Sequence, residues 1–263
     1  MQVRESAYDA LAPRFERERA LPDGVAQAVR ELVLEATGVA HPRVLDLGAG
    51  TGRIGWPFVA ADDDYVGVDL SFGMLRAFMA RCGRAPRLVQ ADGLRLPFAE
   101  AMFDLVMLVQ VFGGLGDWRQ FADEARRVLR PDGAVVIGRT AAPEDGVDAR
   151  MKLQLDSILS ILGAGGAKRR GNARAAVEDL LGARATGVER RIAGTWTAQR
   201  SPRQFIARHR DGARFSTLPE RVKNEAMARL AVWAETEFGS LDAALSEAHA
   251  FELTVFKFEG VTA

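Results

Sequence analysis

Val44-Leu45-Asp46-Leu47-Gly48-Ala49-Gly50-Thr51-Gly52-Arg53 is the stretch of sequence that decides the fold of this chain. Its apolar first half is typical of a short strand that is buried on both faces of a parallel sheet. Its glycines let the backbone turn sharply and let a ligand approach a surface without Cβ atoms. A helix is expected after the turn, with its free N–H groups directed back towards such a ligand. The stretch therefore predicts a ligand site where a strand passes into a helix.

The spacing of the glycines distinguishes two kinds of nucleotide site. Gly48, Gly50 and Gly52 form the pattern G-x-G-x-G. A dinucleotide-binding turn has its third glycine one position later, where this chain has Arg53. The spacing therefore counts against an NAD site and favours a ligand that has no pyrophosphate group.

An acidic residue ends the next predicted strand. Asp69 lies 21 residues after Gly48. A carboxylate at this place can accept hydrogen bonds from both ribose hydroxyls of an adenosine, and NAD proteins use the same device. Asp69 therefore indicates a ribose without saying which cofactor carries it.

Strands and helices alternate over the first 140 residues. Apolar runs predict strands at residues 44–47, 65–69, 88–90, 103–109 and 134–138. Helices are expected from Pro22 to Thr37, around Phe58, after Ser71 and after Asp117. The sequence of residues 130–133 predicts a turn. Five strands that alternate with helices imply a parallel, doubly wound sheet.

The alternation stops after Arg139. Residues 144–182 and 202–238 have helical patterns, and residues 188–198 and 251–258 predict two further strands. An opening helix is predicted around Tyr8 and Phe15. We therefore expect an α/β fold with a Rossmann-like, doubly wound, seven-stranded sheet and helical insertions that cap the site. The expected segments are an N-terminal helical segment at 1–40, a ligand-binding core at 41–143, a helical insertion at 144–184, and the last two strands at 185–263 with a helical cap insertion at about 200–249.

The composition is that of an ordinary globular protein. The chain has 263 residues, of which 48% are hydrophobic, enough for one large core with an insertion. One cysteine, Cys82, excludes an internal disulfide and favours a reducing compartment. The sequence has no apolar run of about eighteen residues and no signal peptide at its start. We therefore expect a cytoplasmic protein that does not bind a membrane.

Charge is distributed unevenly, although the formal net charge is zero. Between Gly163 and Phe215 there are twelve basic and four acidic residues, which leaves a local charge of +8. Such a segment can attract anions, or it can be a solvated helical surface in an arginine-rich sequence. Both interpretations stay open. In the first one, Arg203, Arg208 and Arg210 favour an anionic acceptor, because the planar guanidinium binds carboxylate or phosphate in a bidentate way.

Three further motifs complete an ordered set. They are Ala91-Asp92-Gly93, Leu96-Pro97-Phe98 followed by Phe103-Asp104-Leu105-Val106, and Arg127-Val128-Leu129-Arg130-Pro131-Asp132-Gly133. Together with D-L-G-x-G-x-G they resemble the class I S-adenosylmethionine (SAM) methyltransferases, most closely the small-molecule enzymes of the ubiquinone- and menaquinone-biosynthesis type (methyltransferase type 11). The chain departs from that pattern at Asp132, where a glycine is common. The resemblance covers residues 40–140 and implies a mostly parallel sheet whose last strand is antiparallel.

The resemblance also implies a ligand and a set of contacts. The methyl donor would be SAM, leaving S-adenosylhomocysteine, with a small-molecule acceptor and no metal. Asp46 would meet the ammonium of the methionine moiety, Asp92 would accept from the adenine amino group, and Gln110 would flank the methyl group. The expected cofactor-binding residues are Asp46, Gly48, Ala49, Gly50, Arg53, Asp69, Leu70, Met74, Ala91, Asp92, Gly93 and Gln110. His41, His209 and His249 have no metal-ligand spacing, and the sequence names no catalytic base.

Three other functions are kept as alternatives. An NAD-dependent oxidoreductase is opposed by the glycine spacing and by Asp92. An RNA-directed methyltransferase would use the basic segment, but the chain has no basic runs interleaved with aromatic residues. A SAM-binding protein without catalysis is compatible with the same motifs. A monomer and a homodimer are equally compatible with the sequence.

Overall fold

The structure is a computed structural model of the chain. It describes residues 20–83, 85–113, 115–164, 173–210, 215 and 218–260. The helix predicted around Tyr8 and Phe15 lies outside the described residues, as do Lys168 and Arg214 of the basic segment. None of the described helices combines the length and the apolar character needed to cross a membrane.

The chain forms two compact units that are built from interleaved segments. The first, here called the core unit, comprises Met1–Thr140, Gly171–Gly194 and Phe251–Ala263. The second, here called the helical unit, comprises Ala141–Arg170 and Thr195–Ala250. These units follow the contacts rather than the chain order, and the division into four consecutive segments stays a prediction.

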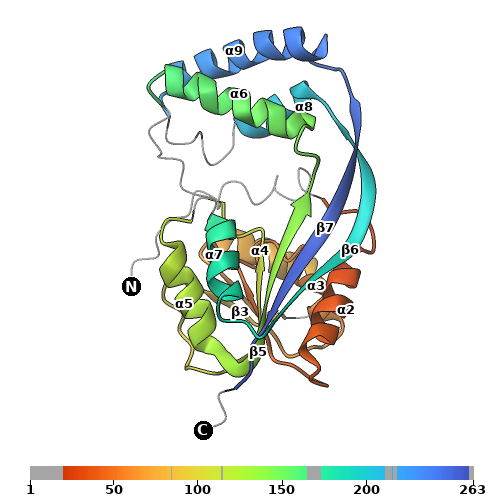
Figure 1. Cartoon of the computed structure of the whole chain (residues 1–263), viewed down its shortest axis with the longest axis vertical. Coiled ribbons are helices and arrows are strands. Elements are labelled where there is room, and N and C mark those ends of the chain that lie inside the picture. The colour runs from red at the N-terminus through yellow and green to blue at the C-terminus, as the bar shows by residue number, and fades with distance from the viewer. Residues whose placement is uncertain are drawn as a thin grey trace. The chain divides into compact units, whose positions relative to one another are not determined.

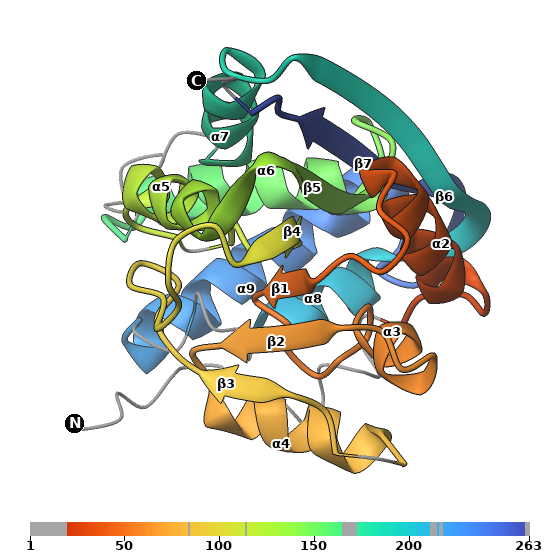
Figure 2. The same cartoon turned by 90° about the horizontal axis from the view of Figure 1, so that it is seen from below.

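A seven-stranded sheet has the order β3-β2-β1-β4-β5-β7-β6. Its strands are β1 (Val44–Leu47), β2 (Tyr65–Asp69), β3 (Leu88–Gln90), β4 (Phe103–Val109), β5 (Leu129–Ala141), β6 (Gly187–Arg200) and β7 (Leu245–Lys257). The first five pair in parallel, and Figure 2 shows β3, β2, β1 and β4 side by side. The last strands run antiparallel. The predicted Rossmann-like, seven-stranded α/β fold is therefore confirmed.

The strand order indicates where a ligand site is expected. Chain order reverses between β1 and β4, which are neighbours in the sheet although two strands separate them in the sequence. Open α/β sheets bind their ligands at the carboxyl ends of the strands at such a reversal. The glycine turn at 48–52 directly follows β1 and so lies at this point.

Local start and stop signals determine the helices. The core unit has α2 (Val25–Thr37), α3 (Trp56–Ala60), α4 (Phe72–Arg81), α5 (Trp118–Val128) and α7 (Ala173–Gly182), and the helical unit has α6 (Val147–Ile161), α8 (Pro202–Arg210) and α9 (Glu220–Phe238). The Ser71 side chain accepts from Met74 N at 3.2 Å, and the Asp117 side chain accepts from Gln120 N at 3.1 Å. Gly38 ends α2 with φ 64°. These signals confirm the predicted end of α2 and the predicted starts of α4 and α5, whereas α2 begins at Val25 and not at Pro22.

The predicted turn at 130–133 is wrong. These residues belong to β5, which begins at Leu129. Leu129 pairs with Phe103 and Ala134 pairs with Leu105, so four residues of β5 stand opposite Asp104 alone as a bulge. Gly133 O accepts a hydrogen bond from Phe258 N at 3.1 Å. The Pro-Asp-Gly signal is local, whereas the strand is held by partners that are distant in the sequence.

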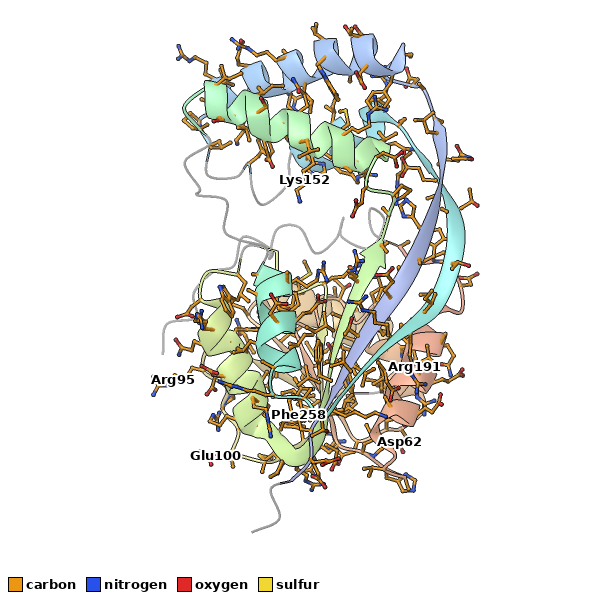
Figure 3. The ribbon with its side chains drawn as sticks, viewed as in Figure 1. Asp62, Arg95, Glu100, Lys152, Arg191 and Phe258 are labelled. Atoms are coloured by element: carbon orange, nitrogen blue, oxygen red, sulfur yellow. The ribbon has the colours of Figure 1, made fainter. Side chains whose placement is uncertain are left out.

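Each unit has its own apolar core. All seven residues of β4 are buried in the core unit. Phe258 belongs to this core near the C-terminus (Figure 3). The Arg126 guanidinium lies 4.7 Å from the centre of its ring. In the helical unit, α6, α8 and α9 pack together through residues such as Met151, Phe205 and Leu230 (Figure 1). Whether these helices cap a site stays a prediction.

Candidate active site

The three glycines of the turn after β1 have different structural roles. Gly48, Gly50 and Gly52 have φ of 89°, 56° and 76°, a region that favours glycine. A Cβ on Gly52 would lie 2.1 Å from Cδ2 of Phe78, so this glycine allows α4 to pack closely. Among the described residues, a Cβ on Gly50 would meet nothing closer than 3.9 Å. Gly50 therefore presents bare backbone to open space, as a ligand cradle requires.

The first half of the turn is tied to β2. Gly48 N and Ala49 N both donate to Val68 O, at 2.8 and 2.9 Å. Ala49 is itself buried. These two bonds hold the end of β1 against the end of β2, where Asp69 follows.

Asp69 joins the two strand ends. Its Oδ2 accepts a hydrogen bond from Gly50 N at 2.8 Å, and its Oδ1 accepts one from Ser71 N at 2.8 Å. Two bonds from backbone N–H groups fix the orientation of a carboxylate. The structure thus brings together Gly50 and Asp69, which the sequence predicted as parts of one site.

Asp46 lies deeper than its neighbours. Its side chain is only 2% exposed and accepts a hydrogen bond from the Tyr65 hydroxyl at 2.7 Å. Burial raises the pKa of Asp46 to about 7; the Tyr65 hydrogen bond opposes this rise, and the charge of Asp69 adds to it. The contact of Asp46 with an ammonium group stays a prediction. The partnership with Tyr65 was not foreseen from the sequence, because Tyr65 is 19 residues away and begins the next strand.

Gln110 links the ends of β4 and β5. Its φ is 53°, which is unusual for a residue other than glycine. The Arg53 guanidinium donates to Gln110 Oε1, and Gln110 Nε2 donates to Thr140 Oγ1 at 2.8 Å. Arg53 and Gln110 were both predicted site residues. Thr140 was missed, and its one signal is its place at the carboxyl end of the strand beside β4.

The predicted adenine side follows β3. Ala91 N donates to Asp69 O at 3.1 Å, and the exposed Asp92 accepts from Leu94 N at 2.9 Å. A Cβ on Gly93 would lie 2.6 Å from the Phe121 ring, so the loop passes close to α5. Leu70 is 43% exposed, whereas the Met74 side chain is buried. The loop therefore lies next to Asp69, and direct contacts of these residues with a ligand stay predictions.

The histidines form no metal site. His209 stacks on Phe205 with ring centres 3.8 Å apart, and His249 lies 3.2 Å from Glu247 Oε2. In the part of the chain that the structure describes, no group of three or more metal-binding side chains occurs.

Comparisons with known proteins decide the family. A family described as a methyltransferase domain matches residues 45–137. The demethylmenaquinone methyltransferase of Deinococcus radiodurans is 31% identical over 172 residues, which cover 62% of this chain and 71% of that protein. The chain belongs to the SAM-dependent methyltransferase family.

Other relatives of this chain match over shorter parts of their length. The demethylmenaquinone methyltransferase of Renibacterium salmoninarum is 32% identical, over 53% of this chain and 59% of that protein. The malonyl-[acyl-carrier protein] O-methyltransferase of Geobacter sulfurreducens is also 32% identical, over 62% of this chain and 61% of that protein. The chain thus spans about three fifths of the length of these two relatives.

Two solved structures share the fold of this chain. The YcgJ protein of Bacillus subtilis has a TM-score of 0.55 at 20% identity, over 89% of this chain and 99% of that chain. A phosphoethanolamine N-methyltransferase of Haemonchus contortus, bound to phosphomonomethylethanolamine and S-adenosylhomocysteine, has a TM-score of 0.51 at 16% identity, over 95% of this chain and 58% of that chain.

The residues of this chain fit the donor that its family uses. SAM combines an adenosine with a methionine moiety, and the family takes its methyl group from it. The open face of Gly50 gives room for close approach, and the fixed carboxylate of Asp69 is suited to a ribose. The site therefore has both features that an adenosine-containing donor needs.

Proposed function

We propose that this protein transfers a methyl group from SAM to a small-molecule acceptor. The observation that carries the proposal is the 2.8 Å hydrogen bond from Gly50 N to Asp69 Oδ2. It joins the glycine turn and the ribose-binding acid into one rigid unit at the reversal point of the sheet. Membership in the methyltransferase family supports the same function.

Methyl transfer depends more on the positioning of the reactants by the protein than on covalent catalysis. A bound SAM supplies an electrophilic methyl group for an in-line displacement. Asp69 would hold the ribose, and the bare backbone at Gly50 would let the ligand lie close to the turn. Holding two reactants in line and excluding water can supply most of the acceleration. We assign no general base, because one is needed only if the acceptor must lose a proton.

Calorimetry tests the donor. We expect SAM and S-adenosylhomocysteine to bind with dissociation constants in roughly the micromolar range, and each to raise the melting temperature by mass action. NAD should do neither. Folded protein that gives no heat with either sulfur ligand contradicts the proposal.

Asp69→Asn tests the ribose contact. The amide keeps one oxygen that can accept from Gly50 N or Ser71 N, so the turn should survive. Affinity for S-adenosylhomocysteine should fall by about 1.5–3 kcal/mol, the range for hydrogen bonds to a charged group. Asp132→Asn is the matched control, because Asp132 is an exposed carboxylate in the bulge at the opposite end of β5. Equal affinities of the two variants contradict the ribose assignment.

The acceptor belongs to the same proposal. Relatives of this chain are named demethylmenaquinone methyltransferase and malonyl-[acyl-carrier protein] O-methyltransferase. We propose a small molecule or a carrier-bound small group, and the first assays should offer demethylmenaquinone and a malonyl thioester with labelled SAM. Transfer to RNA alone would instead favour the nucleic-acid alternative.

We further propose that the acceptor is anionic. In the helical unit, Arg208 binds Asp148 Oδ1 at 2.6 Å, whereas Arg200 Nε lies 3.9 Å from Asp148 Oδ2 and has no hydrogen-bond partner among the described residues. The positive charge of Arg203 is instead compensated by the carboxylate of Asp242, which accepts a hydrogen bond from it at 2.8 Å. Arg200→Gln should therefore raise the KM of a malonyl acceptor several-fold, whereas Arg203→Gln should leave it unchanged. Equal KM values in both variants contradict an anionic acceptor and leave the methyltransferase assignment intact.

Location and assembly complete the proposal. We propose that the protein acts in the cytoplasm as a monomer or homodimer, which the single cysteine and the ordinary composition support. Cell fractionation and light scattering test the two statements separately.

A further inference from the structure

A buried histidine of the helical unit has one ring nitrogen without a partner. The side chain of His249 is only 3% exposed, and its Nε2 lies 3.2 Å from Glu247 Oε2. No described residue forms a hydrogen bond with its Nδ1, although this atom is buried. Buried polar atoms nearly always have a hydrogen-bond partner, so an unpartnered one indicates that something outside the protein chain supplies it.

Glu247 determines which nitrogen of this imidazole carries the hydrogen. Its Oε1 accepts a hydrogen bond from Val147 N at the start of α6, at 2.7 Å. A helix N-terminus favours a negative charge, so Glu247 is ionised and can only accept. The hydrogen of the neutral imidazole therefore lies on Nε2, which leaves a bare lone pair on Nδ1. The unpartnered atom of His249 is thus an acceptor that requires a donor.

Arg200 contributes a second unpartnered atom, a donor, to the same region. Its Nε is buried without a hydrogen-bond partner in the described part of the chain, and it lies 3.9 Å from Asp148 Oδ2. Asp148 directly follows Val147, which donates to Glu247. One unpartnered donor and one unpartnered acceptor therefore lie around the first turn of α6.

The strands β6 and β7 carry these two groups on one face. Residues two apart in a strand point to the same face, so Glu247 and His249 share a face of β7. On the neighbouring strand β6, Trp196 lies beside His249, with ring centres 5.9 Å apart. Arg200 lies four residues after Trp196 and so points to the same face. A single ligand on this face can therefore reach both unpartnered atoms.

We infer that His249 accepts a hydrogen bond from a hydroxyl group of the methyl acceptor. Glu247 acts as a positioning residue, since it holds the imidazole hydrogen on Nε2. The inference rests on the proposed function, in which Arg200 binds an ionised oxygen of the same acceptor. The substrate class that supplies both partners is a hydroxy acid. A malonyl group has a carboxylate but no hydroxyl, so it would leave His249 Nδ1 without a donor.

Matched ligand pairs test the hydroxyl contact. The probes are 4-hydroxybenzoate with 4-methoxybenzoate, and 6-hydroxy-2-naphthoate with 6-methoxy-2-naphthoate. Each methoxy member keeps the ring and the carboxylate but cannot donate a hydrogen bond. In calorimetry on the wild type with S-adenosylhomocysteine present, the hydroxy member of at least one pair should bind roughly tenfold more tightly, as expected for one hydrogen bond.

His249→Phe removes the acceptor and keeps an aromatic ring. The two members of the pair should then bind with equal affinity. His209→Phe is the matched control, because His209 belongs to the same unit but already has a partner for its Nδ1, Phe205 O at 2.8 Å. This control should keep the wild-type ratio of affinities.

Glu247→Gln tests the positioning role while His249 stays in place. The amide oxygen of glutamine can accept from Val147 N, so its N–H group faces the imidazole and moves the ring hydrogen to Nδ1. The preference for the hydroxy member should therefore be lost. The chain has only three histidines, so long-range ¹H–¹⁵N spectra can resolve His249 and should show the hydrogen on Nε2 in the wild type and on Nδ1 in the variant.

Three results would overturn the inference. The first is a folded His249→Phe variant that keeps the wild-type ratio of affinities. The second is a wild type that binds both members of each pair equally or binds neither, which would mean that Nδ1 holds a buried water only. The third is a His249 ring with hydrogens on both nitrogens at the pH of the assay.

The same measurements separate this inference from the proposed function. Normal binding of S-adenosylhomocysteine together with equal affinities within the pairs would overturn the hydroxyl contact alone. A wild type that binds no S-adenosylhomocysteine would overturn the proposed methyl transfer.

Discussion

The core unit and the helical unit each contain a buried carboxylate, and the two carboxylates accept hydrogen bonds from different kinds of donor. Asp46 in the core unit receives a hydrogen bond from a neutral hydroxyl, that of Tyr65 at 2.7 Å. Glu247 in the helical unit receives one from Val147 N, at the start of α6, at 2.7 Å, and its other oxygen lies 3.2 Å from His249 Nε2. A helix N-terminus favours negative charge, whereas the hydrogen bond from Tyr65 favours the carboxylate of Asp46 too little to offset its burial. Asp46 can therefore change its protonation near neutral pH. Glu247 instead holds the start of α6 by its hydrogen bond from Val147 N.

The largest loss in the free energy of unfolding is expected for a substitution in the glycine turn of the core unit, because the backbone there is left-handed and closely packed. Gly52→Ala adds a Cβ that would lie 2.1 Å from the Phe78 ring, at a φ of 76°. Left-handed strain of about 1–2 kcal/mol and overpacking of about 1–3 kcal/mol should together lower the free energy of unfolding by about 3–5 kcal/mol. Urea unfolding followed by circular dichroism measures the change.

Gly24→Ala is the matched control for this turn. Gly24 has φ 83°, but a Cβ there would meet nothing within 4 Å in the part of the chain that the structure describes. Only the backbone strain of about 1–2 kcal/mol should appear. If both variants lose the same free energy, close packing against Phe78 is not what requires Gly52.

The buried pair of Glu247 and His249 in the helical unit should give the next largest effect on the free energy of unfolding. Glu247→Ala would leave Val147 N and the His249 imidazole without an acceptor in a buried place. Loss of both partners should lower the free energy of unfolding by about 3 kcal/mol. Thermal and urea unfolding measure it.

Glu247→Gln keeps one oxygen and serves as the control. That oxygen can still accept from Val147 N, so the loss should be about 1 kcal/mol. If glutamine is as destabilising as alanine, the negative charge itself, and not the hydrogen bond to α6, is what the helical unit needs.

The two units also differ in how much the sequence could predict. The bounds of β2, β3 and β4 follow from apolar runs, and Ser71 and Asp117 mark the starts of α4 and α5 by their side chains. These signals are local, because they depend on neighbours within a few residues. The glycine turn and Asp69 were predictable for the same reason, since each lies at a strand end.

Other parts depend on partners that are far apart in the chain. The bulge in β5 results from its register with β4, and the place of Thr140 results from the pairing of those strands. Gln110 and Thr140 are 30 residues apart, and Val147 and Glu247 are 100 apart. No periodicity or motif spans such distances, so the helical unit's polar contacts were not foreseen.

Measurements of the free energy of unfolding at several pH values test the raised pKa of Asp46 in the core unit. Burial raises the pKa of Asp46 from 3.8 to about 7, so the folded state keeps a proton that the unfolded state loses between about pH 4 and pH 7. The free energy of unfolding should therefore fall as the pH rises through this range and level off above pH 7. Between pH 5 and pH 8 the contribution of Asp46 should be about 2–3 kcal/mol. Urea unfolding at both pH values measures it.

Asp46→Asn isolates this contribution from the other titrating groups. The amide oxygen can still accept from Tyr65 but does not titrate, so the variant should lose less stability than the wild type between pH 5 and pH 8. Tyr65→Phe removes the donor that favours the carboxylate and should move the fall to higher pH. Identical pH profiles for the wild type and Asp46→Asn would contradict a raised pKa at Asp46.

The smallest effects should come from ion pairs of the helical unit that lie nearer to solvent. Arg203 and Asp242 are 60% and 66% exposed, so solvent and salt screen their attraction. Arg203→Gln should leave the unfolding midpoint unchanged. Arg208 is only 19% exposed and lies 2.6 Å from Asp148, which makes its charge more costly to leave unpaired. Arg208→Gln should therefore lower the free energy of unfolding by about 1 kcal/mol, and 0.5 M salt should reduce that difference only in part. Equal midpoints for the two variants would mean that burial does not distinguish the ion pairs of this unit.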